Sequence, residues 1–304
     1  MNQTALDQYE EIVTDALKSC SAKLRKSFQT AFIRLMILYM VLPRKINFTQ
    51  MGRYSDSSEQ RFRQLFEREF DWMQFNHFLI RQRFGESVRK AIAIDASYIS
   101  KSGKKTPYIG KFRSGCASAM KRGLEILGIG IVDIDSRDCM MLRAEQTPNK
   151  AYLEKQGEDY NLVDWYLDVL RKYKDKLLGI TRYVVADAWF SKAKFVNEAC
   201  LIGFHVISRL RDDAALWYSH DGVRTGKRGR PRIKGEKIDF EKLDLQRCEI
   251  LDIEGGRAYS VKAYSKAMKR NIKVVVHYPK SGGHKIYFST DLDMSAKDII
   301  EYYR

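Results

Sequence analysis

The chain has 304 residues, and its 54 Lys and Arg against 38 Asp and Glu give a formal net charge of +16. Hydrophobic residues make up 44% of it, which is enough for a packed core and excludes an intrinsically disordered chain. The best candidate for a membrane span, Ala31 to Leu42, is too short and contains Arg34, so no membrane association is expected. The polar and acidic N-terminus is not a secretory signal.

The net charge and the cysteine pattern narrow the possible classes of protein further. An excess of positive charge this large favours a polyanionic partner, above all nucleic acid, although solubility alone is the plainer explanation. The five cysteines are scattered and include no CxxC pair, which argues against a disulfide framework and a structural zinc site. We therefore expect a cytoplasmic protein.

Residues 1–88 are predicted to be helical, because apolar residues recur at helical spacing up to the break at Pro43. Beyond it, FTQMGRY predicts a short helix, Ser55 to Ser58 a turn, and SEQRFRQLFEREF a second helix with Arg61 and Arg63 near its start. This order is typical of a helix-turn-helix DNA-binding domain, in which these arginines would contact DNA. A small helical bundle without that role shows the same pattern.

From residue 89 the pattern changes to short apolar strands and helices in the order β-β-β-α-β-α-β, up to residue 211. Three antiparallel strands followed by βαβ crossovers predict an α/β fold with a mixed five-stranded sheet. Residues 212–290 alternate like exposed antiparallel strands and are interpreted as a β-rich, basic insertion. Residues 291–304 begin a helix, with Ser295 as its N-cap.

Two acids stand out in this core. Asp95 follows the apolar run of the first strand, and Asp187 ends the fourth, in TRYVVADAWFSK. With the first strand central, the fourth lies next to it and parallel, so both carboxylates would project into one site. Close carboxylates repel unless a cation lies between them, and hard oxygen ligands suit Mg²⁺ or Mn²⁺, including a pair of ions for phosphoryl transfer. For a single Asp, a turn or helix cap is the simpler reading.

Two further features concern nucleic acid. GKRGRPRIKG places five cations close together in a segment that Gly229 and Pro231 keep out of a helix: Lys227, Arg228, Arg230, Arg232 and Lys234. We interpret them as phosphate contacts, with a solvated basic loop as the alternative. Trp189 could stack on an unpaired base, but packing at the sheet edge is the preferred interpretation.

The strand order and several long segments resemble the ribonuclease H-like core of DDE transposases, specifically the IS4 type. The matching segments span roughly residues 50 to 304 and are AIDASYISKSG, VVADAWFSK, ISRLRDDAALWY, GKRGRPRIKG and YFSTDLDMSAKDIIEYYR. The resemblance implies metal-dependent cleavage of DNA at transposon ends and strand transfer into a target, with Asp95 bridging two ions and Asp187 holding one. It also implies a homodimer acting on paired ends in a prokaryotic cytoplasm.

The same family carries a third acid in a Y-x2-R-x3-E signature on the helix after the insertion. Tyr303 fits the Tyr of this signature, which places the Arg and Glu beyond Arg304, whereas Glu301 lies on the wrong side of Tyr303. The sequence thus predicts a chain truncated before its third catalytic acid. The alternatives are a catalytically inactive truncated transposase that only binds DNA and, less favoured, a stand-alone nuclease.

Overall fold

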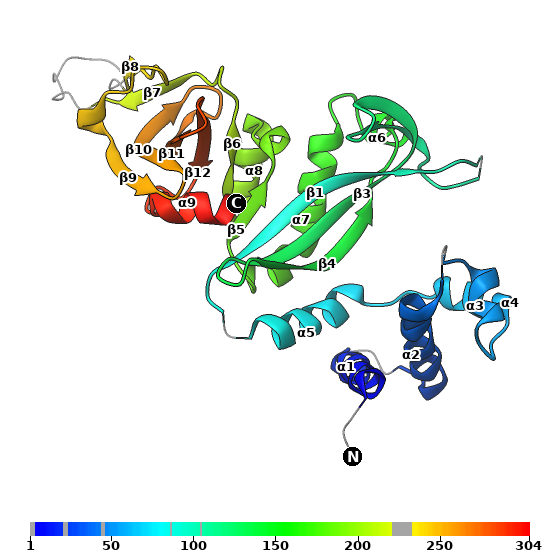
Figure 1. The fold of residues 1–304 in the computed structure, drawn as a ribbon. Helices are drawn as coiled ribbons and strands as arrows, with labels where there is room; N and C mark the ends of the chain where they lie inside the picture. The colour runs from blue at the N-terminus through cyan, green and yellow to red at the C-terminus, as the bar shows by residue number, and fades with distance from the viewer. Residues whose placement is uncertain (1–3, 21–23, 44–45, 86, 104, 221–232) are drawn as a thin grey trace. The chain divides into compact units, whose positions relative to one another are not determined.

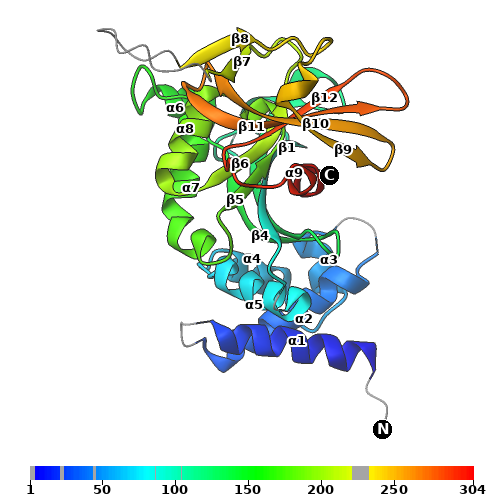
Figure 2. The same ribbon diagram turned by 90° about the vertical axis from the view of Figure 1, so that its left-hand side faces the viewer.

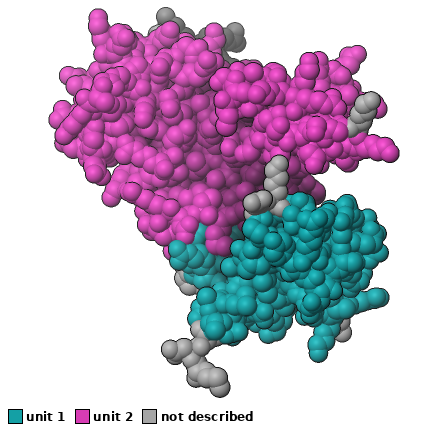
Figure 3. Space-filling model, turned by 45° about the vertical axis from the view of Figure 1, so that its right-hand side comes forward, with its two compact units in different colours: residues 1–86 teal, residues 87–304 magenta. Residues whose placement is uncertain are grey.

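A computed structural model describes residues 4–20, 24–43, 46–85, 87–103, 105–220 and 233–304. The chain divides into two compact units, residues 1–86 and 87–304, which Figure 3 colours separately. The sequence placed this boundary at residue 88. Among the described residues, no helix is long and apolar enough to cross a membrane.

The first unit is helical, as its periodicity predicts. Polar side chains begin its helices: Thr4 and Asp7 form a capping box at the first, and Asp71 caps the last. Phe32 lies at the centre of an aromatic core, with its ring 4.9 Å from that of Phe70 and 5.3 Å from that of Phe75. The helices, drawn in blue to cyan in Figure 1, are α1 (Ala5–Ser19), α2 (Lys26–Val41), α3 (Phe48–Arg53), α4 (Glu59–Phe66) and α5 (Trp72–Phe84).

Helices α3 and α4 are the pair that the sequence suggests as a helix-turn-helix. Asn47 caps the first and Ser58 the second, each by accepting a backbone N–H. Gly52 lets them approach closely, because a Cβ there would lie 3.0 Å from the backbone nitrogen of Glu59. The arrangement is therefore two short helices in tight contact across a short turn.

The second unit is built on one 12-stranded mixed sheet with the path β2-β3-β1-β5-β6-β12-β11-β10-β7-β8, while β4 pairs with β3 and β9 with β10. Its first strands are β1 (Lys90–Ser100), β2 (Gly110–Ser114), β3 (Ala119–Asp133), β4 (Asp138–Gln146), β5 (Tyr183–Ala186) and β6 (His205–Leu210). The remaining strands are β7 (Leu216–Ser219), β8 (Lys234–Lys237), β9 (Glu249–Ile253), β10 (Gly256–Ser265), β11 (Arg270–Pro279) and β12 (Lys285–Ser289).

The predicted α/β class with its mixed five-stranded arrangement is confirmed within this sheet. Strand β1 lies between β3, to which it is antiparallel, and β5, to which it is parallel, and β6 is parallel to β5. Strand β4 pairs with Ile126–Asp133 of β3, and β2, which the sequence did not indicate, pairs with Ala119–Gly123 of the same strand. The parallel pairs follow from the helical crossovers between their strands.

The strands of the basic insertion do not form a separate sheet. Strand β12 pairs antiparallel with β6, and β11, β10, β7 and β8 continue from it. The free edge of β6 needs a partner for its backbone groups, and the returning chain supplies one, so residues after 212 extend the core sheet.

Helices cover the two faces of the sheet (Figures 1 and 2). On one face lie α7 (Leu162–Leu178) and α8 (Ala193–Ile202), and α6 (Lys150–Glu154) precedes them. On the other face, α9 (Ala296–Tyr303) packs on a cluster that includes Ala91, Ile207 and Val275. As predicted, Ser295 is the N-cap of this last helix.

Candidate active site

Asp95 and Asp187 lie next to each other where β5 ends, Asp95 being in the middle of β1 and not at the strand end that the sequence suggests. Strands β1 and β5 are in register from Ile92 and Val184 to Ile94 and Ala186; Asp95 is the next residue of β1, and Asp187 directly follows β5. Residues in register on adjacent strands point to the same face. Both carboxylates are exposed, and alternation places them on the face that carries α9.

The charge of Asp187 affects the pKa of Asp95. Partial burial raises the pKa of Asp95 above its usual range, a hydrogen bond from the backbone of Ala96 lowers it, and repulsion from the charge of Asp187 raises it again. A divalent cation between the two would remove this repulsion, and carboxylate oxygens are the ligands that Mg²⁺ and Mn²⁺ prefer. The donor set therefore fits such an ion.

Asp187 is also the helix cap that a single Asp at a strand end suggests. One of its carboxylate oxygens accepts the backbone N–H of Trp189 at 2.9 Å and so begins the short helix η1 (Ala188–Phe190). Its backbone carbonyl accepts the hydroxyl of Ser208 at 2.8 Å. The two readings are compatible, because the cap uses one oxygen and fixes the carboxylate beside Asp95.

Arg209 and Tyr303 join this site from β6 and α9. Val185 pairs with Ile207 in the parallel strands β5 and β6. Asp187 comes two residues after Val185 and Arg209 two residues after Ile207, so they occupy matching positions. Burial raises the pKa of Tyr303, the positive charge of Arg209 lowers it, and the negative charge of Asp187 raises it, so both charges act on the Tyr303 hydroxyl. The buried Nε of Arg209 has no hydrogen-bond partner among the described residues.

Arg209 is a candidate that the sequence alone does not indicate. It lies in ISRLRDDAALWY, one of the segments used for the family resemblance, but nothing in that segment marks it as different from Arg211. The signal that could have identified it is the strand order: a residue at the end of a strand parallel to β5 must lie beside Asp187. Tyr303 was found through the signature and not through its contacts.

Trp189 and Lys192 border the acids on the side of α7. The ring of Trp189 meets those of Tyr166 at 5.6 Å and Phe190 at 5.0 Å, yet 39% of the residue remains exposed. The ammonium of Lys192 lies 3.4 Å from the centre of the Trp189 ring. Burial lowers the pKa of Lys192, while the attraction of Asp187 raises it.

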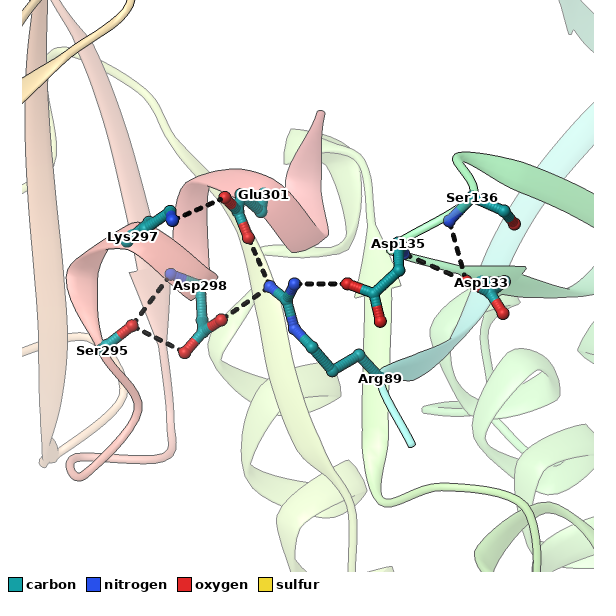
Figure 4. A network of polar contacts seen from close by, with 8 residues as sticks. All are labelled: Arg89, Asp133, Asp135, Ser136, Ser295, Lys297, Asp298 and Glu301. Carbon is teal, nitrogen blue, oxygen red and sulfur yellow. Dashed lines mark hydrogen bonds and ion pairs between the residues drawn. The ribbon is translucent and has the colours of Figure 1, made fainter. Parts of the chain in front are cut away.

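Glu301 takes part in a polar network around Arg89 (Figure 4). Its carboxylate accepts a hydrogen bond from Arg89, which also binds Asp298 at 2.7 Å and Asp135 at 2.6 Å, and Lys297 lies 3.7 Å from it. In the part of the chain that the structure describes, no group of three or more His, Cys, Asp or Glu side chains could hold a metal ion. Asp95 and Asp187 thus stand as a pair.

The cations expected to bind DNA are placed only in part. Lys227, Arg228, Arg230 and Arg232 lie outside the described residues, whereas Lys234 begins β8 with its ammonium 4.9 Å from the Trp217 ring. Arg61 is exposed on α4. Arg63 is paired with Glu59 on the same helix and lies 4.9 Å from the ring of Phe48.

Comparison with known proteins gives a family match over most of the chain. The family model described as DDE superfamily endonuclease matches residues 39–270. A search of curated proteins found no significant match.

Two solved structures show weak likeness to this chain. The piggyBac transposase synaptic complex with hairpin DNA is 13% identical over 100% of this chain, with a TM-score of 0.35, and the match covers 57% of that transposase chain. Ciona intestinalis Endonuclease V, in complex with a 24mer DNA containing an inosine followed by a ribo-adenosine, is 12% identical over 70% of this chain and 75% of its own, with a TM-score of 0.32.

Proposed function

The chain belongs to the DDE superfamily endonucleases, and from this premise we propose that it acts as a DNA transposase. In this role it cleaves phosphodiester bonds at the ends of a mobile element and transfers the resulting 3′-hydroxyl to target DNA. The observation that carries the proposal is the register of β1 and β5, which sets Asp95 beside Asp187.

Asp95 and Asp187 are the proposed ligands of Mg²⁺ or Mn²⁺ in a two-ion site. Such ions, when bound, activate a water or hydroxyl and stabilise the leaving oxygen of a phosphodiester. The chain's own contribution is to hold two carboxylates on adjacent strands, with Asp187 oriented by the N–H of Trp189 and by Ser208. Because these partners are fixed before DNA binds, little reorganisation is needed at the reaction.

Arg209 is proposed to bind a phosphate oxygen beside the acids. A guanidinium offers a planar set of N–H donors that fits phosphate, and the Nε of Arg209 has no protein acceptor among the described residues. Tyr303 lies against Tyr287, ring centres 5.1 Å apart, and can help to keep Arg209 directed toward the site.

The remaining elements fit roles in DNA binding. The net charge of +16 favours binding to phosphates, α3 and α4 are proposed to contact the element ends through Arg61, and the segment from Lys227 to Lys234 to contact phosphates without reading sequence. A homodimer of the IS4 type, acting on paired ends in the cytoplasm of a prokaryote, is the assembly that we propose.

The test uses the purified chain with Mg²⁺ or Mn²⁺ and a duplex carrying the inverted repeat that flanks its reading frame. We expect cleavage at the repeat end, lost in Asp95→Asn and Asp187→Asn and retained in Asp175→Asn, an exposed acid of α7. DNA binding without cleavage by the unaltered chain would favour the alternative, a protein that binds DNA and does not cut.

A further inference from the structure

Lys192 and Trp189 form a cation and aromatic pair at the edge of the acid site. The ammonium lies over the ring, 3.4 Å from its centre, while Trp189 keeps 39% exposure and rests on Tyr166 of α7. Lys192 itself is exposed and follows η1, which Asp187 caps. An ammonium held this close to the face of a ring is oriented by the attraction between the cation and the ring.

The partners of Lys192 leave its charge available. Among the residues that the structure describes, its side chain makes no ion pair, and its neighbours are the Trp189 ring and the more distant charge of Asp187. Lys194, two residues further along, is different because its ammonium lies 2.6 Å from the carboxylate of Asp164. The Lys192 ammonium is therefore available to bind an anionic group of a ligand, whereas the Lys194 ammonium is already paired with Asp164.

The position of Trp189 and Lys192 relative to the acids suits the binding of an anionic substrate. Trp189 and Lys192 lie on the side of α7, through Tyr166, and Arg209 lies on the opposite side, against Tyr303 of α9. Asp187 is close enough to both Lys192 and Tyr303 to change their pKa values. Asp187 thus lies near two cations, Lys192 at the start of α8 and Arg209 on β6, an arrangement that suits the approach of a polyanionic strand.

We propose that Lys192 binds a backbone phosphate of the DNA strand on the α7 side of the scissile bond, and that Trp189 holds its ammonium ready for that contact. This inference rests on the proposed function, because it takes DNA as the substrate of the same site. Lys192 acts as a positioning residue: it sets the register of the strand over the acids and takes no part in the reaction.

The test is a coupling experiment between Lys192 and single phosphates. The duplex carrying the inverted repeat is made with one uncharged methylphosphonate at each position around the cleavage point, and affinity is measured without metal for the unaltered chain, Lys192→Ala and Lys194→Ala. We expect one methylphosphonate on one side of the cleavage point to weaken the unaltered chain about tenfold and to have no effect on Lys192→Ala. Lys194→Ala should behave as the unaltered chain at every position.

Two further measurements separate a phosphate contact from a structural role. Lys192→Ala should reduce the slope of log affinity against log salt by about 0.9, while Lys192→Arg, which keeps the charge, should restore it. Trp189→Phe should keep the coupling to that phosphate, and Trp189→Leu should reduce it, because the ring that orients the ammonium is lost.

The outcomes distinguish this inference from the proposed function. If the unaltered chain cleaves the repeat end but each methylphosphonate penalty is the same in Lys192→Ala, the phosphate contact is excluded and the function stands. If the unaltered chain does not bind the duplex at all, the proposed function itself fails.

Discussion

Asp95 and Asp187 occupy neighbouring positions in the register of two parallel strands, each directly after a paired residue, Ile94 and Ala186. Long stretches of chain separate them, and the crossover through α7 is what returns the second strand to the side of the first. The pair is costly without a cation, since partial burial and mutual repulsion both raise the pKa of Asp95. This cost makes the site testable without DNA.

The first prediction concerns metal binding. Mn²⁺ should raise the melting temperature of the unaltered chain relative to EDTA, by roughly 2–4 °C for each kcal/mol of binding free energy, because only the folded state brings the acids together. Asp95→Asn should melt slightly higher than the unaltered chain in EDTA, since the repulsion is gone, and should lose the response to Mn²⁺. Asp175→Asn serves as the control, and an equal response in Asp95→Asn would contradict the assignment.

The second prediction concerns Arg209. If its guanidinium binds a phosphate oxygen in the reacting strand, Arg209→Lys should lower the rate of cleavage by about 10²-fold, the scale of a lost donor to developing charge. The affinity for DNA should change much less, because many other cations contribute to it. Single-turnover cleavage and binding titrations measure the two effects, with the exposed Arg211→Lys as the control. Equal losses in both variants would remove Arg209 from the site.

The third prediction concerns the attachment of α9 to the sheet. Arg89→Ala breaks contacts to Asp135, Asp298 and Glu301 at once and should lower the free energy of unfolding by about 1–2 kcal/mol, a value reduced for partial exposure of these groups. Lys297→Ala, in which an exposed ammonium 3.7 Å from Glu301 is lost, should cost about 0.5 kcal/mol or less. Urea unfolding of the two variants gives the comparison, and similar values would show that the network contributes little.

The fourth prediction concerns alkaline pH. Burial and a hydrogen bond to Asp291 at 2.8 Å raise the pKa of Tyr183 from 10.0 to about 12. A raised pKa in the folded state means that the stabilising effect is complete below pH 10 and is lost as the pH rises toward 12. Urea unfolding at pH 8, 10 and 11 should therefore show a steeper loss in the unaltered chain than in Tyr183→Phe, by about 1 kcal/mol after allowing for solvent screening. Parallel curves would show that Tyr183 ionises as freely in the folded chain as in the unfolded one.

Much of this architecture could be predicted from local patterns. Helical spacing before residue 88 and short apolar runs after it reflect which side chains each element must bury, and this is a property of the sequence itself. Asp95 and Asp187 stood out for the same reason, because each follows an apolar run, although β1 continues past Asp95 to Ser100. The order of strands and crossovers then allowed few topologies, and the observed β4-β3-β1-β5-β6 arrangement is the one expected.

Other features depend on contacts between distant segments. The pairing of β12 with β6, which continues the core sheet into the insertion, depends on which free edge the returning chain meets. Arg209 and Arg211 look alike in the sequence, and only the register with β5 and the approach of Tyr303 place Arg209 beside Asp187. The ion pair between Arg89 and Glu301, which lie near the two ends of the second unit's sequence, could not be predicted from the sequence either.

The sequence by itself thus determined the fold class and the placement of the two acids on neighbouring strands, because hydrophobic periodicity and an acid after an apolar run are local properties. Only the tertiary structure decided what surrounds the acids: Lys192 on the Trp189 ring, Arg209, whose Nε has no hydrogen-bond partner within the described ranges, and Glu301 bound by Arg89. The physical reason is that a charged side chain interacts with the groups that surround it in the folded protein. Those groups come from distant strands and helices, so the packing of the whole sheet decides them and neighbours in the chain do not.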